Sequence, residues 1–234
     1  MIKAAVTAAM MEGVATDQDR SLAVRSCWIE VALLFMALFF MISGFALWGL
    51  SHSLLASLAW KDFFRKMFGD GVRRVYRLGF NIFSVLTLLP VLWLMWIPPS
   101  PVLYLVPAPW KYLMLVGQAI AAFLLLYGVL QTDILSFIGL RQLFDAEDRT
   151  HAFVTNGLYR FVRHPLYGAG LLFLWLTPTM TINRLTVYGC ATIYILIGAH
   201  FEERKLLREF GTAYAEYKAL TPMIIPGLLF NRGR

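Results

Sequence analysis

The sequence is poor in charged residues, and this scarcity excludes most classes of soluble protein. Charged residues make up 15% of its 234 positions and hydrophobic residues 59%, against about 25% and about 45–50% in an ordinary soluble domain. A chain of this composition cannot cover the surface of a water-soluble globule with polar groups. We therefore expect an integral membrane protein in a lipid bilayer, and neither a disordered chain nor a coiled coil.

Cysteine is also scarce, and metal-binding motifs are missing. Cys27 and Cys190 lie far apart and form no CxxC pair, so neither a disulfide framework nor a zinc knuckle is expected. The four histidines include no HExxH motif, and we predict no metal site. The first 20 residues lack the apolar run of about 7–15 residues that a signal peptide contains.

Long apolar runs are abundant. Five of them approach or reach the roughly 20 residues that a membrane-crossing helix needs; they cover 28–50, 78–97, 110–130, 166–182 and 185–201. We predict an all-α, polytopic membrane helix bundle. It forms a single domain over 1–234, with a three-helix part at 28–130 and a second part at 131–234.

The ends of these runs predict the connections between helices. The first run continues past His52, so it is either one helix or bends along the interface, with His52 as an interfacial anchor. Five prolines between 98 and 109 indicate a stiff, uncharged connector between the second and third helices. Pro178 and Asn183 predict a tight turn at 177–184 between the fourth and fifth helices.

The net charge of +7 is distributed unevenly along the chain. Of the 21 Lys and Arg residues, 16 fall in 51–77, in 131–165 and after 201, and five fall elsewhere. Cytoplasmic loops carry the excess of Lys and Arg, so we predict an extracytoplasmic N-terminus and a cytoplasmic C-terminus. The membrane that we expect is a bacterial inner membrane. Because the membrane topology explains the surplus of positive charge, we expect no nucleic-acid partner.

Residues that could bind an anionic ligand gather in 151–168. Pro165 is suited to the first turn of a helix, whose backbone N–H groups favour an anionic group such as a carboxylate. Arg163 adds a fork of donors, and Tyr159 and Tyr167 offer flat faces for a heteroaromatic ring. A basic turn that anchors a helix explains the same pattern, and both interpretations stay open here.

A second cluster follows the last apolar run. Apolar residues recur there at spacings of three and four, which predicts an amphipathic helix lying on the membrane interface. Glu202 and Glu203 stand where this helix begins. Neighbouring side chains on a helix point about 100° apart, so at most one of the two carboxylates faces a given pocket.

Three motifs together resemble a known superfamily. They are HxxVTxGxY at 151–159, RHPLYG at 163–168, and EExxLxxxFGxxYxxY at 202–217 followed by TPxxIPG at 221–227. They resemble the isoprenylcysteine carboxyl methyltransferase and phospholipid methyltransferase superfamily of integral membrane enzymes. Upstream, HSLLAS, YRLGFN, TLLP and TDILSFIGLRQ are similar to its NnrU-like bacterial branch, which includes methanethiol S-methyltransferases.

The resemblance implies S-adenosylmethionine as cofactor, in a pocket at the inner membrane face. Aromatic residues would contact the adenine, backbone donors near Pro165 the methionine carboxylate, and Glu202 the amino group. The cofactor-binding residues carried over by motif position are His151, Val154, Tyr159, His164, Pro165, Tyr167 and Glu202; Arg163 joins them because of its donor fork.

One departure from the superfamily concerns the acceptor. Members that methylate carboxylates carry an arginine about one turn before the first glutamate, where this chain has Gly198. The departure favours a small apolar or thiol acceptor arriving from the lipid side. A thiol must lose its proton, since its pKa is about 8.5, and we predict His200 as the base, with Glu203 second.

Other functions stay open at this stage. The same chemistry could act on a prenylcysteine carboxylate or a phospholipid amine. A membrane reductase of the sterol type would need a nicotinamide site, and the sequence has no phosphate-cradling glycine pattern. A non-catalytic NnrU-like membrane protein would not bind S-adenosylmethionine at all.

Overall fold

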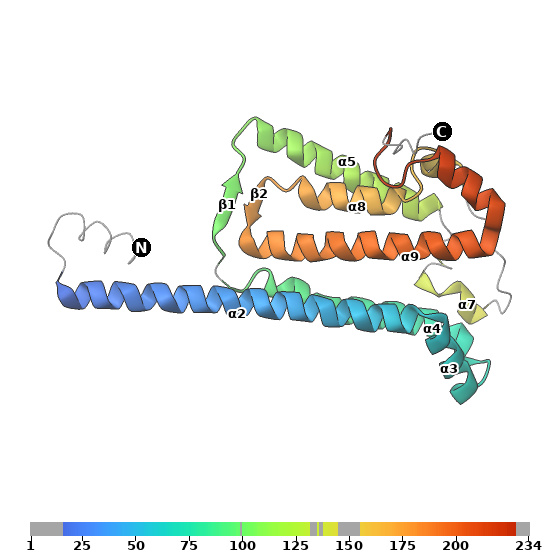
Figure 1. The fold of residues 1–234 in the computed structure, drawn as a ribbon, viewed down its shortest axis with the longest axis horizontal. Coiled ribbons are helices and arrows are strands. Elements are labelled where there is room, and N and C mark those ends of the chain that lie inside the picture. Colours follow the sequence, from blue (N-terminus) through green and yellow to red (C-terminus); the bar gives the residue numbers. More distant parts are fainter. Residues whose placement is uncertain (1–15, 99, 132–134, 136–137, 145–154, 228–234) are drawn as a thin grey trace.

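The computed structural model describes residues 16–98, 100–131, 135, 138–144 and 155–227. Long helices dominate it and run side by side (Figure 1). Four of them are long and apolar enough to cross a membrane, within α2 (Asp17–Ala56), α4 (Val72–Leu94), α5 (Trp110–Gln131) and α9 (Ile182–Leu220). The prediction of a helical membrane bundle is therefore confirmed.

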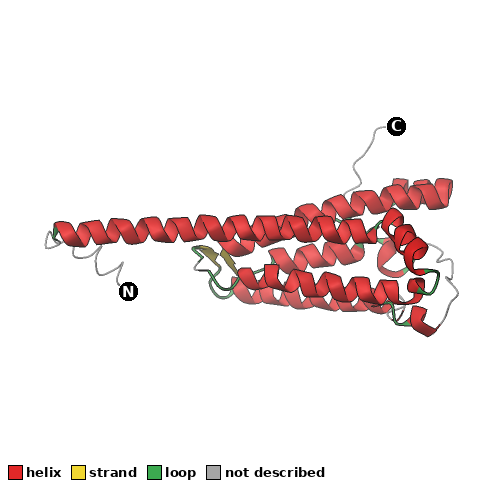
Figure 2. Cartoon of the chain, turned by 90° about the horizontal axis from the view of Figure 1, so that it is seen from below, coloured by secondary structure: helices red, strands yellow, loops and turns green. Residues whose placement is uncertain are grey.

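The first helix is longer than its apolar run. A capping box between Thr16 and Asp19 starts α2, and its 40 residues correspond to about 60 Å. Its N-terminal part extends beyond the other helices, as Figures 1 and 2 both show. At Ser57 the backbone turns extended and a separate helix, α3 (Leu58–Phe68), begins. The first apolar run therefore bends after Ala56.

The predicted fourth crossing helix is shorter than expected. Helix α8 (Pro165–Trp175) has 11 residues, about 16 Å, against a hydrocarbon core of about 30 Å. After it the chain forms a strand, β2 (Thr179–Thr181), which pairs antiparallel with β1 (Val102–Leu105). Among the described helices, four rather than five are thus long enough to cross alone.

These strands lie within the two predicted connections. The proline-rich connector contains β1, and the predicted tight turn contains β2. Asn183 is not a turn residue but a fully buried residue of α9. Its backbone N–H donates to Ser100 Oγ at 2.9 Å and its side-chain Nδ2 to the Pro98 carbonyl at 3.2 Å. Tertiary hydrogen bonds override the turn preference of asparagine here.

The helices pack in the order α5, α8, α9, α2, α4 (Figure 1). Ala37 and Met41 of α2 meet Val187 of α9 in the buried core. Gly117 and Gly128 of α5 face leucines of the α8 region, and a Cβ at either glycine would lie 2.6 Å from a leucine methyl carbon. Small residues of this kind let membrane helices approach closely.

One end of the bundle carries the candidate chemistry. This end, which we call the α3 end, is formed by α3, α7 (Arg141–Phe144), the 3-10 helix η1 (Gly157–Arg160) and the last turns of α9 (Figure 1). The three segments rich in Lys and Arg (51–77, 131–165 and the part after 201) lie far apart in sequence. Their described parts meet at this end of the bundle.

Candidate active site

A sharp bend in α9 shapes the site. Gly211 has φ 56° and ψ −127°, a conformation that glycine adopts without the steric cost that a side chain would bring. The helix resumes beyond it and turns back toward η1 and α8 (Figure 1). The predicted flat amphipathic helix is therefore two segments: a continuation of α9 to Phe210, and a shorter helix that covers the site.

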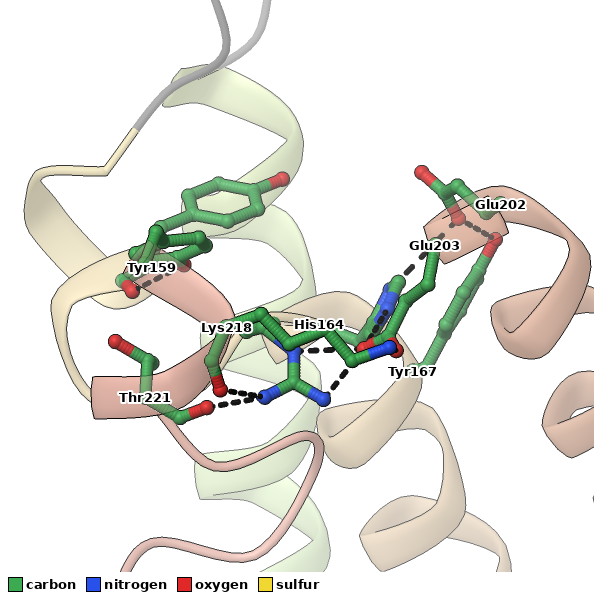
Figure 3. Close-up of polar contacts among 9 residues, drawn as sticks. Tyr159, His164, Tyr167, Glu202, Glu203, Lys218 and Thr221 are labelled. Carbon is green, nitrogen blue, oxygen red and sulfur yellow. Dashed lines mark hydrogen bonds and ion pairs between the residues drawn. The ribbon is translucent and has the colours of Figure 1, made fainter. Parts of the chain in front are cut away.

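A buried ion-pair cluster joins these segments. Glu203 Oε1 lies 2.6 Å from both Nε and Nη2 of Arg163, and its Oε2 lies 2.7 Å from Lys218 Nζ (Figure 3). The Glu203 and Arg163 side chains are 5% and 9% exposed. Nη1 of Arg163 donates to the carbonyl oxygens of Lys218 and Thr221. Arg163 therefore ties the start of α8 to both parts of α9.

The C-terminal TPxxIPG segment closes this arrangement. Backbone N–H groups of Arg163 and His164 donate to the carbonyls of Pro222 and Met223, at 2.9 and 3.0 Å. The Tyr217 hydroxyl donates to the Tyr159 carbonyl at 2.6 Å. These bonds hold the residues before α8 against the end of α9.

The second carboxylate, Glu202, has a different environment. Its Oε2 accepts a hydrogen bond from the Tyr167 hydroxyl at 2.8 Å and lies 3.7 Å from His164 Nδ1. His164 is buried, stacks on the Tyr167 ring with centroids 5.2 Å apart, and its Nε2 lies 3.5 Å from Glu203 Oε1. The Glu202 side chain remains 45% exposed. Glu203 is thus held by protein cations, whereas Glu202 keeps an accessible side.

Tyr159 borders the same space. In Figure 3, Tyr159 lies to the left of His164 and Glu202 to its upper right. Burial, followed by the charge of Glu202, raises the pKa of the Tyr159 hydroxyl. As a protonated phenol, this hydroxyl is available as a hydrogen-bond donor.

The structure brings most of the predicted site residues together. Those that it places around this cluster are Tyr159, Arg163, His164, Pro165, Tyr167, Glu202 and Glu203. His151 and Val154 lie outside the described residues. His200 is exposed and, at about 100° per residue, points about 160° away from Glu202 around α9.

The sequence patterns do not identify three residues that make tertiary contacts in the site or across the bundle. Lys218 and Tyr217 belong to the predicted interfacial helix, and the helix-breaking Gly211 between them and Glu203 is the signal that they fold back. Tyr194 meets His52 across the bundle, 2.6 Å from Nδ1, and no local pattern indicates this contact. His52 therefore lies between helices rather than serving as a simple interfacial anchor.

Comparisons with curated proteins identify the family. The chain is 35% identical over 211 residues to "Methanethiol S-methyltransferase 2" of Bradyrhizobium diazoefficiens, covering 87% of this chain and 75% of the relative. It is 31% identical over 191 residues to the "Methanethiol S-methyltransferase" of Crocosphaera subtropica, covering 77% and 71%. The chain belongs to the methanethiol S-methyltransferase family. No family model and no solved structure matches it.

A shorter similarity extends to the wider superfamily. Over 81 residues, 33% of this chain and 34% of the relative, the sequence is 30% identical to the "Protein-S-isoprenylcysteine O-methyltransferase" of Dictyostelium discoideum. Together with the helical bundle, these relatives make the chain an integral membrane methyltransferase. Among the described residues, no group of three or more His, Cys, Asp or Glu side chains could hold a metal ion.

Proposed function

We propose that this methyltransferase moves the methyl group of S-adenosylmethionine to a small thiol such as methanethiol. S-adenosylmethionine supplies an activated methyl group on a sulfonium sulfur. The relatives named methanethiol S-methyltransferase support the thiol. The proposal of S-adenosylmethionine as cofactor rests on the arrangement of Glu202 and Tyr167 beside the start of α8.

These residues suit the amino-acid part of the cofactor. Glu202 is a half-exposed carboxylate oriented by the Tyr167 hydroxyl, and it can pair with an ammonium group. Helix α8 begins at Pro165 without a capping side chain, so its N-terminal N–H groups can receive a carboxylate. The Tyr159 ring and hydroxyl complete the set as contacts for the nucleoside, with His151 and Val154 proposed from their motif positions.

Arg163 and Glu203 have positioning roles in this proposal. The donors of Arg163 are directed at Glu203 and at two backbone carbonyls, rather than at a ligand carboxylate. Glu203 is surrounded by Arg163, Lys218 and His164, which makes it a poor proton acceptor. His200, on the far side of α9 from Glu202, is also poorly placed to act as the base.

Gly198 supports a small neutral acceptor. It lies one helical turn before Glu202, and a Cβ built on it would meet nothing within 4 Å. The space beside the cofactor site therefore contains no cation at this position to bind a carboxylate substrate. Methyl transfer would depend mainly on orientation, which can contribute about 7–11 kcal/mol.

The proposed topology follows the charge count. The segments that hold 16 of the 21 Lys and Arg residues include α3, η1 and the end of α9, which form the α3 end. By the positive-inside rule, we place this end and the C-terminus in the cytoplasm of a bacterium, with α2 starting outside the inner membrane. The site then lies where a water-borne cofactor meets an acceptor dissolved in lipid.

Calorimetry in detergent tests the cofactor site. Glu202→Gln and His164→Ala are expected to weaken S-adenosylmethionine binding at least about tenfold, because a hydrogen bond to a charged group contributes about 1.5–3 kcal/mol. Glu209→Gln, an exposed acid farther along α9, is the matched control and should bind normally. Unchanged affinity in both site variants would overturn the assignment.

A product assay tests the acceptor. Purified protein is incubated with labelled S-adenosylmethionine and, separately, methanethiol, a phospholipid amine and a prenylcysteine analogue. We expect label in the volatile thioether alone. Label in lipid or in a methyl ester would replace the thiol by that acceptor while leaving the cofactor site intact.

A further inference from the structure

We propose that His52 and Tyr194 form the proton-accepting pair for the methyl acceptor, which binds beside Gly198 between this pair and Glu202. The inference rests on the proposed thiol methylation and adds to it the residues that remove the thiol proton. It starts from a contact between two helices far apart in sequence: the Tyr194 hydroxyl lies 2.6 Å from Nδ1 of His52.

The surroundings of this pair fix both rings. The His52 ring packs between Trp48 and Phe80, with centroids 5.1 and 4.8 Å away. Tyr194 packs closely on α2 because residue 49 is glycine; a Cβ there would lie 3.1 Å from the Tyr194 ring. Rings held in this way keep the short hydroxyl–imidazole contact without further ordering when a substrate arrives.

The pair remains within reach of a small molecule. His52 and Tyr194 are both partly rather than fully buried, and the exposed Ser53 places its Oγ 3.3 Å from the Tyr194 hydroxyl. Phe80, which contacts the His52 ring, also lines a cavity at the α3 end, together with Tyr76 and the polar side chains of Lys61, Arg77 and Asn81. A small acceptor that enters this cavity therefore reaches Phe80, the ring next to His52, from the region between α2 and α4.

Helix geometry connects the pair to the cofactor site. Tyr194, Gly198 and Glu202 are spaced four residues apart on α9, so they fall within an arc of about 80° and a length of about 12 Å. Tyr194 faces α2 through His52, and Glu202 faces α8 through Tyr167. Gly198 lies between them, with open space in place of a side chain.

The proposed step moves one proton and one methyl group. The thiol proton passes to the Tyr194 oxygen while the Tyr194 proton passes to Nδ1 of His52, which becomes an imidazolium. The freed sulfur pair forms a bond to the methyl carbon of S-adenosylmethionine. The bond between that carbon and the sulfonium sulfur breaks, and its electrons return to the sulfur. The products are a thioether, S-adenosylhomocysteine and a proton that His52 releases to solvent.

Comparing two methyl acceptors of nearly the same shape distinguishes a role in proton removal from a purely structural role of His52 and Tyr194. Methanethiol must lose a proton to react, whereas methaneselenol is already ionised at neutral pH. His52→Asn keeps an acceptor oxygen for Tyr194 but cannot take a proton, and Tyr194→Phe keeps the ring packing. Both variants are expected to lower kcat for methanethiol at least about a hundredfold, and kcat for methaneselenol less than about threefold.

Controls make each outcome decisive. Tyr188→Phe, the same substitution on the same helix but close to the β1–β2 end, should change neither rate. Calorimetry should give wild-type S-adenosylmethionine affinity for His52→Asn and Tyr194→Phe. Equal loss with both acceptors, or no loss with methanethiol, would overturn the pair. If the wild-type protein methylates no thiol at all, the proposed function fails instead.

Discussion

Lys218 Nζ lies 2.7 Å from Glu203 Oε2, although a straight helix would separate these two residues by about 22 Å along its axis. The bend at Gly211 closes this gap and brings Tyr217 and Lys218 over the residues that precede α8. A single backbone conformation therefore assembles the buried ion-pair cluster beneath the proposed cofactor site.

Replacing Gly211 by alanine is expected to weaken the whole site. A side chain in this sparsely populated backbone region costs about 1–3 kcal/mol, so Gly211→Ala should lower the melting temperature and the affinity for S-adenosylmethionine together. Gly189→Ala is the control, because Gly189 lies in the regular part of α9 with nothing within 4 Å of a built Cβ. It should leave stability unchanged or raise it by up to about 1 kcal/mol. Unfolding followed by circular dichroism in detergent, with calorimetry, measures both.

Removing Arg163 should destabilise the protein more than removing an exposed arginine. Arg163→Leu leaves Glu203 buried beside a single strong partner, Lys218, and breaking a buried ion pair costs about 3–5 kcal/mol. Adding Glu203→Gln removes the buried charge and should restore part of the loss. Arg160→Leu, at an exposed position of η1, should change stability by less than about 0.5 kcal/mol. Additive losses in the Arg163 and Glu203 double variant would contradict the direct pair.

Filling the space beside Gly198 should affect the acceptor and not the cofactor. Gly198→Leu is expected to raise the KM for methanethiol about tenfold while S-adenosylmethionine affinity stays unchanged. The matched control is Gly189→Leu, nine positions earlier on α9 and also open around its Cβ. Steady-state kinetics with gas chromatography of the thioether gives the comparison. A wild-type KM in Gly198→Leu would place the acceptor elsewhere.

The hydrogen bond from Tyr217 should make a modest contribution to stability and to cofactor affinity. Tyr217→Phe removes the 2.6 Å bond to the Tyr159 carbonyl, and such a bond contributes about 0.5–1.5 kcal/mol. We expect a small drop in melting temperature and a loss of cofactor affinity of less than about tenfold. Tyr112→Phe, at an exposed position of α5, serves as the comparison. A loss as large as that of Glu202→Gln would show that Tyr217 acts on the ligand directly.

The sequence by itself determines the membrane class and the family motifs. Entry into lipid depends on the length and apolarity of a segment and little on its neighbours, so the long runs in α2, α4, α5 and α9 predict the helices that the structure contains. The run at 166–182 is apolar enough for lipid and therefore predicts a crossing helix. Its last residues instead form β2, because they pair with β1.

The tertiary structure alone decides the environment of each side chain within the site. Glu202 and Glu203 are adjacent residues of the same type, and the positions of Tyr167, Arg163 and Lys218 make one accessible and the other buried among cations. The contact of His52 with Tyr194 likewise joins helices separated by most of the chain. Such contacts are set by the packing of α2, α8 and α9, which no local pattern of residues encodes, and by the bend at Gly211, for which the glycine itself is the signal.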